Sequence, residues 1–186
     1  VGTDTFGLWA IHRHRGLDIA KVGFDSMTVL SRMTEATMHW EFGETVMEDS
    51  RRELSRHLPI WLCAEGSVLI TGLGLGCVVR GLLASDRVNR IDVIERDRAI
   101  IDRIWPEFQR DGRASVHHGD ALKIDLSGAW DWAWHDIWTD EERALQLLHG
   151  DLIGRFKDRV RHQGAWGFPR LAKRLMGGEF FSSGNP

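Results

Sequence analysis

The sequence predicts an α/β fold: a parallel sheet of about five strands with flanking helices, preceded by a small antiparallel β region. From residue 67 onward, short apolar runs of strand length alternate with patterns of helical period, which is typical of a parallel sheet with helical crossovers. Before residue 48, β-branched and apolar residues alternate with polar ones, which is typical of antiparallel strands. The first apolar run also ends in a cluster of glycines, as expected where a strand turns tightly into a helix.

Length and composition fit a soluble globular protein. The chain has 186 residues, 27% of them charged, and a net charge of -3, which argues against a nucleic-acid partner. No apolar run reaches the roughly 20 residues that a membrane-spanning helix needs, and the first residues do not resemble a secretion signal. With only Cys63 and Cys77, a disulfide scaffold is not expected. We therefore expect a cytoplasmic protein that does not contact a membrane.

The first part of the chain, residues 1–47, is expected to be an N-terminal β-hairpin region. Residues 1–14 read as a loose start, and residues 16–47 as three or four short antiparallel strands separated by glycines and polar pairs. A helix is expected over residues 48–58, where an apolar stripe runs through charged residues until Pro59 ends it.

Residues 48–180 are expected to form the main domain, and residues 181–186 a flexible tail. The expected elements are strand 67–71, helix 75–84, strand 90–95, helix 98–108 with its last turn loosened by Pro106, strand 114–117, strand 131–136, helix 139–161, strand 164–168 and helix 171–176. This alternation implies a parallel sheet with right-handed crossovers. An exposed edge of such a sheet favours a homo-oligomer.

A nucleotide-binding βαβ unit is indicated by the glycines and by an acid that follows them. Gly72, Gly74 and Gly76 come directly after Thr71, and Glu95 ends the next apolar run nineteen residues after Gly76. Glycines let the backbone approach a ligand closely, and an acid at that strand end accepts hydrogen bonds from ribose hydroxyls. The spacing is G-x-G-x-G, which differs from the G-x-G-x-x-G of dinucleotide-binding turns.

Two further strand ends carry acids, Asp120 and Asp136. Ligands of open parallel sheets bind beyond the carboxyl ends of the strands, so we expect these acids to lie near Glu95 and the glycine turn. Each feature alone has a simpler explanation, since Asp120 and Asp136 also suit turns or helix caps. Their order along the chain favours a shared ligand site.

This set of motifs resembles the class I S-adenosylmethionine-dependent methyltransferases, which have a Rossmann-like fold, over residues 67–138. The resemblance implies S-adenosylmethionine as the cofactor and assigns cofactor-binding roles to Thr71, Gly72, Gly74, Gly76, Glu95, Arg96, Asp120, Ala121 and Asp136. In that assignment the methionine part lies at the glycines, the ribose at Glu95 and the adenine beside Asp120. Because only residues 169–186 follow the fifth strand, the strand pair that usually completes this family's sheet is expected to be missing.

The segment before the glycines resembles the spermidine synthase subgroup of this fold. Glu53, His57 and Pro59 match its E-x-x-x-H-x-P pattern, which implies that Glu53 is a substrate-binding residue. The chain departs from the subgroup in having no tyrosine, which its members use to hold a diamine, and in carrying Leu75 where the synthases have an acid. Aminopropyl transfer is therefore an alternative rather than the main prediction.

The predicted function is methyl transfer from S-adenosylmethionine to an unidentified small-molecule acceptor. Asp136 is the first candidate for the catalytic base and His135 the second, with His118 as a further choice. Trp138 and Trp166 are expected to bind the substrate as an aromatic wall. No His, Cys and carboxylate spacing suggests a metal. The alternatives are an aminopropyltransferase, an enzyme that cleaves S-adenosylmethionine, and a non-catalytic cofactor-binding or assembly module.

Overall fold

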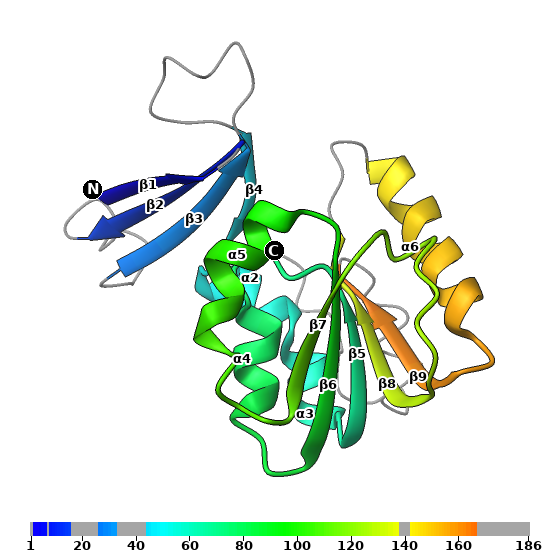
Figure 1. Cartoon of the computed structure of the whole chain (residues 1–186). Helices are drawn as coiled ribbons and strands as arrows, with labels where there is room; N and C mark the ends of the chain where they lie inside the picture. The colour runs from blue at the N-terminus through cyan, green and yellow to red at the C-terminus, as the bar shows by residue number, and fades with distance from the viewer. Residues whose placement is uncertain (1, 7, 16–25, 33–43, 138–141, 167–186) are drawn as a thin grey trace, which may run out of the picture.

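The computed structural model describes residues 2–6, 8–15, 26–32, 44–137 and 142–166. These residues form a four-stranded antiparallel sheet and a five-stranded parallel sheet with helices on both of its faces (Figure 1). The predicted fold class is therefore confirmed. The expected final helix 171–176 and tail 181–186 lie outside the described residues, as does any strand beyond residue 166.

The N-terminal sheet has the strand order β1 (Gly2–Phe6), β2 (Trp9–Arg15), β3 (Ser26–Arg32) and β4 (Glu44–Glu48). The expectation of a loose start over residues 1–14 is wrong, because strands β1 and β2 pair as a hairpin in which Phe6 lies opposite Trp9. The hairpin is stabilised by tertiary packing, because Ile11 of β2 and Leu30 of β3 are buried in the same cluster as the core of the parallel sheet.

Two short helices replace the single helix expected over residues 48–58. They are α2 (Arg51–Arg56) and α3 (Leu58–Cys63), and His57 is the last cap of the first and the first cap of the second. Pro59 lies in the first turn of α3, where its missing N–H has no helical partner to lose, so proline starts a helix there. Ser50 caps α2 by accepting a hydrogen bond from the amide of Glu53.

The parallel sheet follows the predicted alternation of strands and helices. Its elements are β5 (Gly66–Thr71), α4 (Cys77–Leu83), β6 (Val88–Glu95), α5 (Arg98–Ile104), the 3-10 turn η1 (Trp105–Glu107), β7 (Ala114–His118), β8 (Trp130–His135), α6 (Glu142–Phe156) and β9 (Val160–Ala165). The strand order is β7-β6-β5-β8-β9, all parallel. The chain therefore changes direction across the sheet between β5 and β8, which is where such sheets bind ligands.

The end of α6 and the start of β9 both come earlier than expected. Helix α6 ends at Phe156 rather than near residue 161, and β9 begins at Val160 rather than residue 164. Val160 is buried and pairs with Trp130 of β8, so residues that could have extended the helix join the sheet instead. Strand pairing of this kind is long-range and leaves no local signal.

Both faces of the parallel sheet are covered. Val68 and Ile70 of β5 pack in the cluster that contains α4 and α5, while Leu69 between them packs in the cluster that contains α6. All three side chains have no solvent exposure. This two-sided burial explains why the strand is a continuous apolar run rather than an alternating one.

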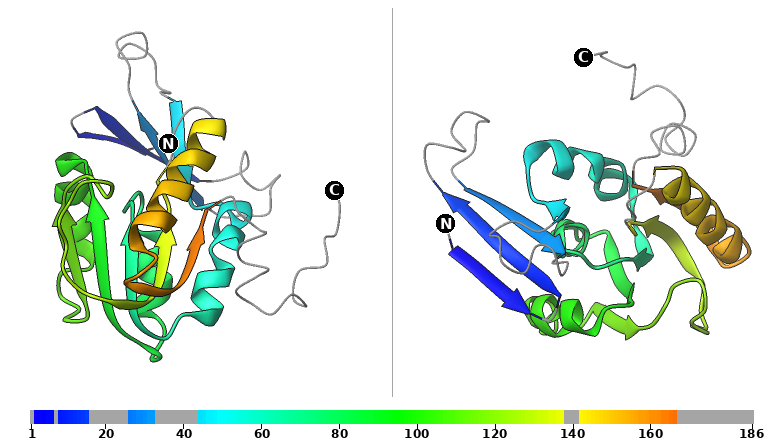
Figure 2. Two further views of the ribbon diagram at one scale, coloured as in Figure 1. Left: turned by 90° about the vertical axis from the view of Figure 1, so that its right-hand side faces the viewer. Right: turned by 90° about the horizontal axis from the view of Figure 1, so that it is seen from above.

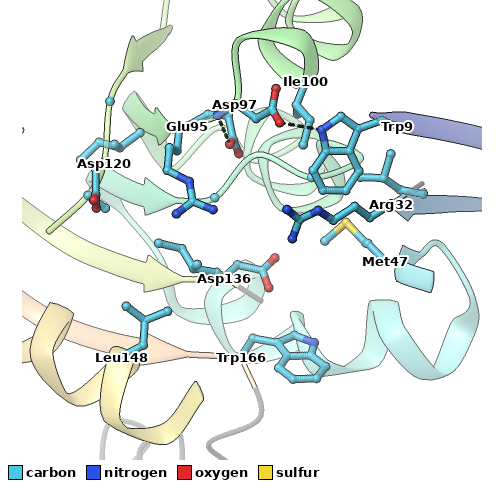
Figure 3. A pocket seen from close by; sticks show the side chains of 18 of the residues that line it. Trp9, Arg32, Met47, Glu95, Asp97, Ile100, Asp120, Asp136, Leu148 and Trp166 are labelled. Carbon is cyan, nitrogen blue, oxygen red and sulfur yellow. Dashed lines mark hydrogen bonds between the residues drawn. The ribbon is translucent and has the colours of Figure 1, made fainter. Parts of the chain in front are cut away.

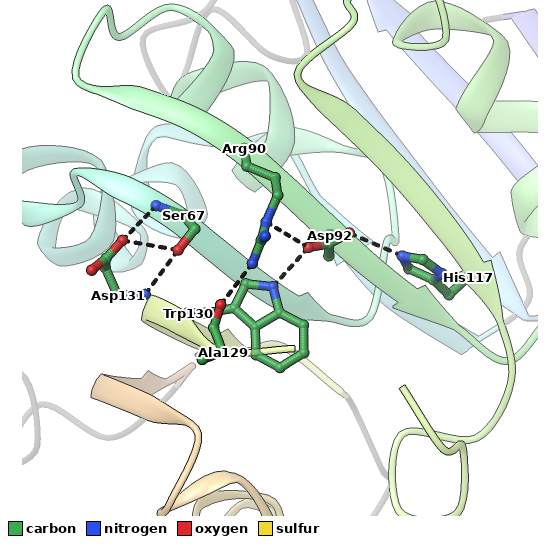
Figure 4. Close-up of polar contacts among 7 residues, drawn as sticks. All are labelled: Ser67, Arg90, Asp92, His117, Ala129, Trp130 and Asp131. Atoms are coloured by element: carbon green, nitrogen blue, oxygen red, sulfur yellow. Dashed lines mark hydrogen bonds and ion pairs between the residues drawn. The ribbon is translucent and has the colours of Figure 1, made fainter. Parts of the chain in front are cut away.

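Two polar clusters join the strands away from the carboxyl ends (Figure 4). The Asp131 carboxylate at the start of β8 accepts hydrogen bonds from the amide and hydroxyl of Ser67, both at 2.8 Å. Asp92 of β6 accepts from Trp130 Nε1 at 2.7 Å and contacts His117 Nε2 at 3.0 Å. These contacts link β5 to β8, and β6 to both β7 and β8.

Candidate functional site

Figure 2 shows the N-terminal sheet lying beyond the carboxyl ends of the parallel strands. A cavity of about 570 Å³ lies between them (Figure 3). Its wall combines the end of the parallel sheet with residues from the N-terminal sheet, α2 and α6. The residues that line it are Leu8, Trp9, Leu30, Arg32, Met47, Glu53, Gly72, Gly74, Ile94, Glu95, Arg96, Asp97, Ile100, Gly119, Asp120, Ala121, Leu122, Asp136, Ile137, Ala144, Leu148 and Trp166. Most of the predicted site residues are thus brought together.

The glycine turn forms one wall of this cavity. Gly72 has a φ of 93°, and a Cβ there would overlap the backbone carbonyl of Asp136. Gly74 also has a positive φ, and a Cβ there would come within 2.5 Å of Met47 Sδ. Gly76 lies behind them as the first cap of α4. Glycine is therefore required at Gly72 and Gly74, and it leaves the backbone of the turn accessible to a ligand.

Glu95 faces the turn with its carboxylate held in place. The amide of Leu73 donates to Oε2 at 2.8 Å, and the amide of Asp97 donates to Oε1 at 2.8 Å. The side chain is buried yet lines the cavity. A carboxylate oxygen has more than one lone pair, so each Glu95 oxygen can still accept a hydrogen bond from a ligand hydroxyl. The predicted pairing of Glu95 with the glycine turn is what the structure contains.

The N-terminal sheet is anchored to Asp97, two residues after Glu95, and the sequence analysis did not predict this contact. Trp9 Nε1 donates to Asp97 Oδ2 at 2.7 Å, while Asp97 Oδ1 caps α5 through the amide of Ala99. A second link joins Arg103 Nε to Asp4 Oδ2 at 2.7 Å. Trp9 and Asp97 are 88 residues apart, so no local pattern marks them.

Asp120 and its neighbours form the end of the cavity beyond β7. The Asp120 carboxylate accepts a hydrogen bond from the amide of Leu122 at 2.9 Å, which is the main reason why its pKa is lowered. Lys123 Nζ lies 3.4 Å from its other oxygen. Ala121 is buried and Arg96 is exposed, and both line the cavity. This end combines an ionised acid with small and apolar surfaces.

Asp136 directly follows β8 and is largely buried, with 9% of its side chain exposed. Burial, and secondarily the charge of Glu53, raises its pKa from 3.8 to about 8. His57 Nε2 lies 3.9 Å from Asp136 Oδ2, and burial lowers the His57 pKa to about 4. Neither ring nitrogen of His57 has a hydrogen-bond partner among the described residues. Near neutral pH we therefore expect a protonated Asp136 beside a neutral His57.

Glu53 and Trp166, both predicted to bind the substrate, contact each other at the cavity wall. Trp166 Nε1 donates to Glu53, and Arg56 Nη1 donates to the same carboxylate at 2.8 Å. The Arg56 guanidinium also lies 4.8 Å from the centre of the Trp166 ring. The charge of Glu53 is thus already partnered. Trp138, the other predicted substrate-binding tryptophan, lies outside the described residues.

Thr71 and His135 do not line the cavity. His135 is completely buried, and its pKa is lowered to about 4 by burial. Its Nδ1 lies 3.1 Å from the Thr71 hydroxyl and its Nε2 lies 3.0 Å from Gln163 Oε1. Gln163 Nε2 donates to the carbonyl of Ile153, so Oε1 faces His135, and His135 Nε2 must carry the proton. Thr71 and His135 therefore contact each other in the buried layer next to the glycine turn, outside the cavity.

His118 is not among the residues that line the cavity, and its Nε2 lies 3.0 Å from the backbone carbonyl of Arg96. Among the described residues, no group of three His, Cys, Asp or Glu side chains is placed to hold a metal ion. Within the same residues, no helix has the length and apolar character needed to cross a membrane.

Known proteins resemble this chain in sequence over about half of its length. It is 33% identical over 99 residues to ribosomal RNA small subunit methyltransferase A of Pseudomonas aeruginosa, a match that covers 53% of this chain and 36% of that protein. The protein of the same name from Nitrosospira multiformis is 34% identical over 86 residues, 46% of this chain and 32% of that protein. The matches thus span about a third of these relatives. No family model matches the sequence.

Among solved structures, spermidine synthase from Thermotoga maritima aligns with 94% of this chain and 63% of its own, with a TM-score of 0.57 and 15% sequence identity. The likeness therefore concerns the fold and includes the N-terminal sheet. Together with the strand order, the glycine turn and Glu95, these similarities give the chain the class I S-adenosylmethionine-dependent methyltransferase fold.

Proposed function

We propose that this protein is an S-adenosylmethionine-dependent methyltransferase. The observation that carries the proposal is the contact between Glu95 and the amide of Leu73, which places a fixed carboxylate opposite the glycine turn inside the cavity. A ribose whose two hydroxyls donate hydrogen bonds to Glu95 would lie against the backbone of Gly72 and Gly74, where no side chain blocks its approach. The sequence similarity to proteins named as methyltransferases supports the same activity.

The residues of the cavity fit the parts of such a cofactor. Gly72 and Gly74 would hold the amino-acid part, Glu95 the ribose, and Asp120 with Ala121 the adenine. When bound, the cofactor supplies an activated methyl group on sulfur. The protein then has to orient the acceptor, exclude water and take up one proton.

Asp136 is the residue that we propose as the proton acceptor. It lines the cavity, and its pKa of about 8 makes the ionised form a stronger base than an ordinary carboxylate. When the acceptor takes up the methyl group that the bound cofactor would supply, the acceptor's proton would pass to an Asp136 carboxylate oxygen. His135 cannot share this role from its buried position, where Thr71 and Gln163 occupy both ring nitrogens.

The acceptor is proposed to be a small molecule bound between Asp136, Glu53 and Trp166. These residues line the cavity together, and residues of the N-terminal sheet line another side of it. An RNA acceptor is the second candidate, because the relatives in sequence are named for ribosomal RNA. Incubation with methyl-labelled cofactor and either total bacterial RNA or pooled small metabolites separates the two by where the label appears. Label found in RNA alone would contradict the small-molecule proposal.

Calorimetry with S-adenosylhomocysteine tests the cofactor site. Glu95→Gln keeps the shape of the side chain but removes its charge, so we expect binding to weaken about 10- to 150-fold. Glu107→Gln is the matched control, since Glu107 is half exposed and pairs with Arg80 outside the cavity lining. No binding by the parent protein at millimolar ligand would contradict the proposal and favour a non-catalytic assembly module.

Product analysis separates methyl transfer from other uses of the same cofactor. Methyl transfer yields S-adenosylhomocysteine, whereas aminopropyl transfer or cleavage of the sulfonium yields methylthioadenosine. Aminopropyl transfer is tested because the chain shares its fold with a spermidine synthase. Methylthioadenosine as the main product would contradict the methyltransferase proposal. A cytoplasmic location and a homo-oligomeric state stay predictions.

A further inference from the structure

Arg32 is a cation of the cavity wall whose charge has no partner in the described residues. It ends β3, is exposed, and makes no hydrogen bond or ion pair with another residue that the structure describes. Figure 3 shows its side chain pointing into the cavity from the N-terminal sheet, on the side away from Asp120. The other arginine of the lining is Arg96, which follows Glu95.

The position of Arg32 is fixed by a chain of contacts that leads to Glu95. In the antiparallel ladder, Arg32 is the direct partner of Trp9, so the two side chains share a face of the N-terminal sheet. Trp9 donates to the Asp97 carboxylate, and the amide of Asp97 donates to Glu95. The end of β3 is therefore held at a set place relative to the ribose-binding carboxylate.

The charge of the lining makes an unpartnered arginine informative. Five carboxyl side chains line the cavity, those of Glu53, Glu95, Asp97, Asp120 and Asp136, against two arginines. Even with Asp136 protonated and Glu53 paired with Arg56, Glu95, Asp97 and Asp120 leave the lining acidic, so a ligand carboxylate would be repelled unless a cation met it. A guanidinium matches a carboxylate in charge and in planar, two-pronged geometry.

We infer that Arg32 binds the α-carboxylate of the cofactor's amino-acid part, an assignment that rests on the proposed function. With the adenine beside Asp120 and the ribose at Glu95, the amino-acid part extends along the glycine turn toward Met47 and the N-terminal sheet. Arg32 lies on that side of the cavity. The carboxylate supplies the counter-charge that Arg32 otherwise lacks.

This contact makes Arg32 a specificity-determining residue for the form of the cofactor. A decarboxylated cofactor leaves Arg32 without its partner and brings an uncompensated positive charge close to it. The carboxylated form, which is the one used for methyl transfer, is then preferred. Leu75, an apolar residue at the turn, adds no negative charge that would reverse this preference.

The test compares two neutral-sulfur ligands that differ in the amino-acid part. S-adenosylhomocysteine carries the carboxylate, and methylthioadenosine has the adenosine and sulfur without it. By calorimetry, Arg32→Gln is expected to weaken S-adenosylhomocysteine binding roughly 10- to 150-fold and methylthioadenosine binding by no more than about twofold. Arg32→Lys, which keeps the charge, should recover part of the loss.

Arg96→Gln is the matched control, because it removes the other cation of the lining next to Glu95. It is expected to change the affinity for both ligands by the same factor. Equal effects of Arg32→Gln on both ligands, or no effect on either, would overturn the assignment of Arg32 while leaving the proposed function intact. A parent protein that binds neither ligand overturns the proposed function and this assignment together.

Discussion

Burial of Asp136 predicts that the stability of the protein falls as the pH rises through neutrality. Its pKa is raised from 3.8 to about 8 because the carboxyl is removed from water and lies near the charge of Glu53. Above its unfolded pKa and below its folded one, the folded state keeps a proton that the unfolded state has released. The free energy of unfolding therefore decreases with increasing pH over that range.

The effect of Asp136 is followed between pH 6.5 and 8. Burial lowers the pKa of His57 and of His135 from 6.5 to about 4, and each of these makes stability increase between pH 4 and about pH 7. About half of each histidine is still protonated in the unfolded state at pH 6.5 and almost none at pH 8, so the two histidines oppose part of the Asp136 effect in this range. One proton over about 1.5 pH units at roughly 1.36 kcal/mol per unit sets an upper limit of about 2 kcal/mol. Because the histidines offset part of this and 9% of the Asp136 side chain is still exposed, we expect a net loss of about 1 kcal/mol.

Asp136→Asn removes the ionisation while keeping the shape of the side chain. Urea unfolding followed by tryptophan fluorescence at several pH values between 6.5 and 8.5 should show this decrease in the parent and not in the variant. Asp86→Asn is the control. Because Asp86 is exposed, this variant should show the same decrease of the free energy of unfolding with pH as the parent. Parallel curves for the parent and Asp136→Asn would refute the reasoning.

The same variant connects stability to catalysis. If Asp136 accepts the acceptor's proton, turnover should rise with pH toward about 8 in the parent, where the carboxylate form becomes populated. Asp136→Asn should then reduce turnover far more than affinity for S-adenosylhomocysteine. Equal losses in both would argue that Asp136 only shapes the pocket.

Two further predictions concern the turn and the N-terminal sheet. Gly72→Ala should destabilise the protein by about 2–4 kcal/mol in urea unfolding, because the new Cβ overlaps the Asp136 carbonyl at a positive φ. Gly150→Ala is the control: Gly150 lies on α6 with open space around it, so this variant should stabilise the protein by about 0.5–1 kcal/mol. Trp9→Phe keeps an aromatic ring but removes the bond to Asp97, and should increase hydrogen exchange in β1 and β2 while costing about 1–3 kcal/mol. Unchanged exchange in Trp9→Phe would contradict the anchoring role of that bond.

Much of the parallel sheet could be predicted because its signals are local. The apolar runs that became β5, β6, β7 and β8 are bounded by turns and separated by helical patterns, and each was expected within two residues of its observed limits. The split of the helix near Pro59 and the early start of β9 were not expected. Proline there starts a helix as well as ending one, and β9 is decided by pairing with β8 rather than by its own residues.

The candidate site could be predicted in part. Residues on the nucleotide unit, such as Gly72, Glu95 and Asp120, line the cavity because the topology brings all carboxyl ends of parallel strands to one edge. His135 follows the same logic along the chain but points into the core, and strand alternation decides this: it faces Phe156 of α6, while the next residue, Asp136, reaches the cavity.

The sequence by itself determined the chemistry of the turn, because glycine is needed wherever the backbone takes a positive φ against a neighbouring strand end. Only the tertiary structure decided which residues close the cavity above that turn. Trp9 and Arg32 reach it because the N-terminal sheet packs Ile11 and Leu30 on the main core. Asp136 acquires its raised pKa because the fold buries its carboxyl near the charge of Glu53. Burial and long-range docking depend on the whole fold, so no short stretch of sequence encodes them.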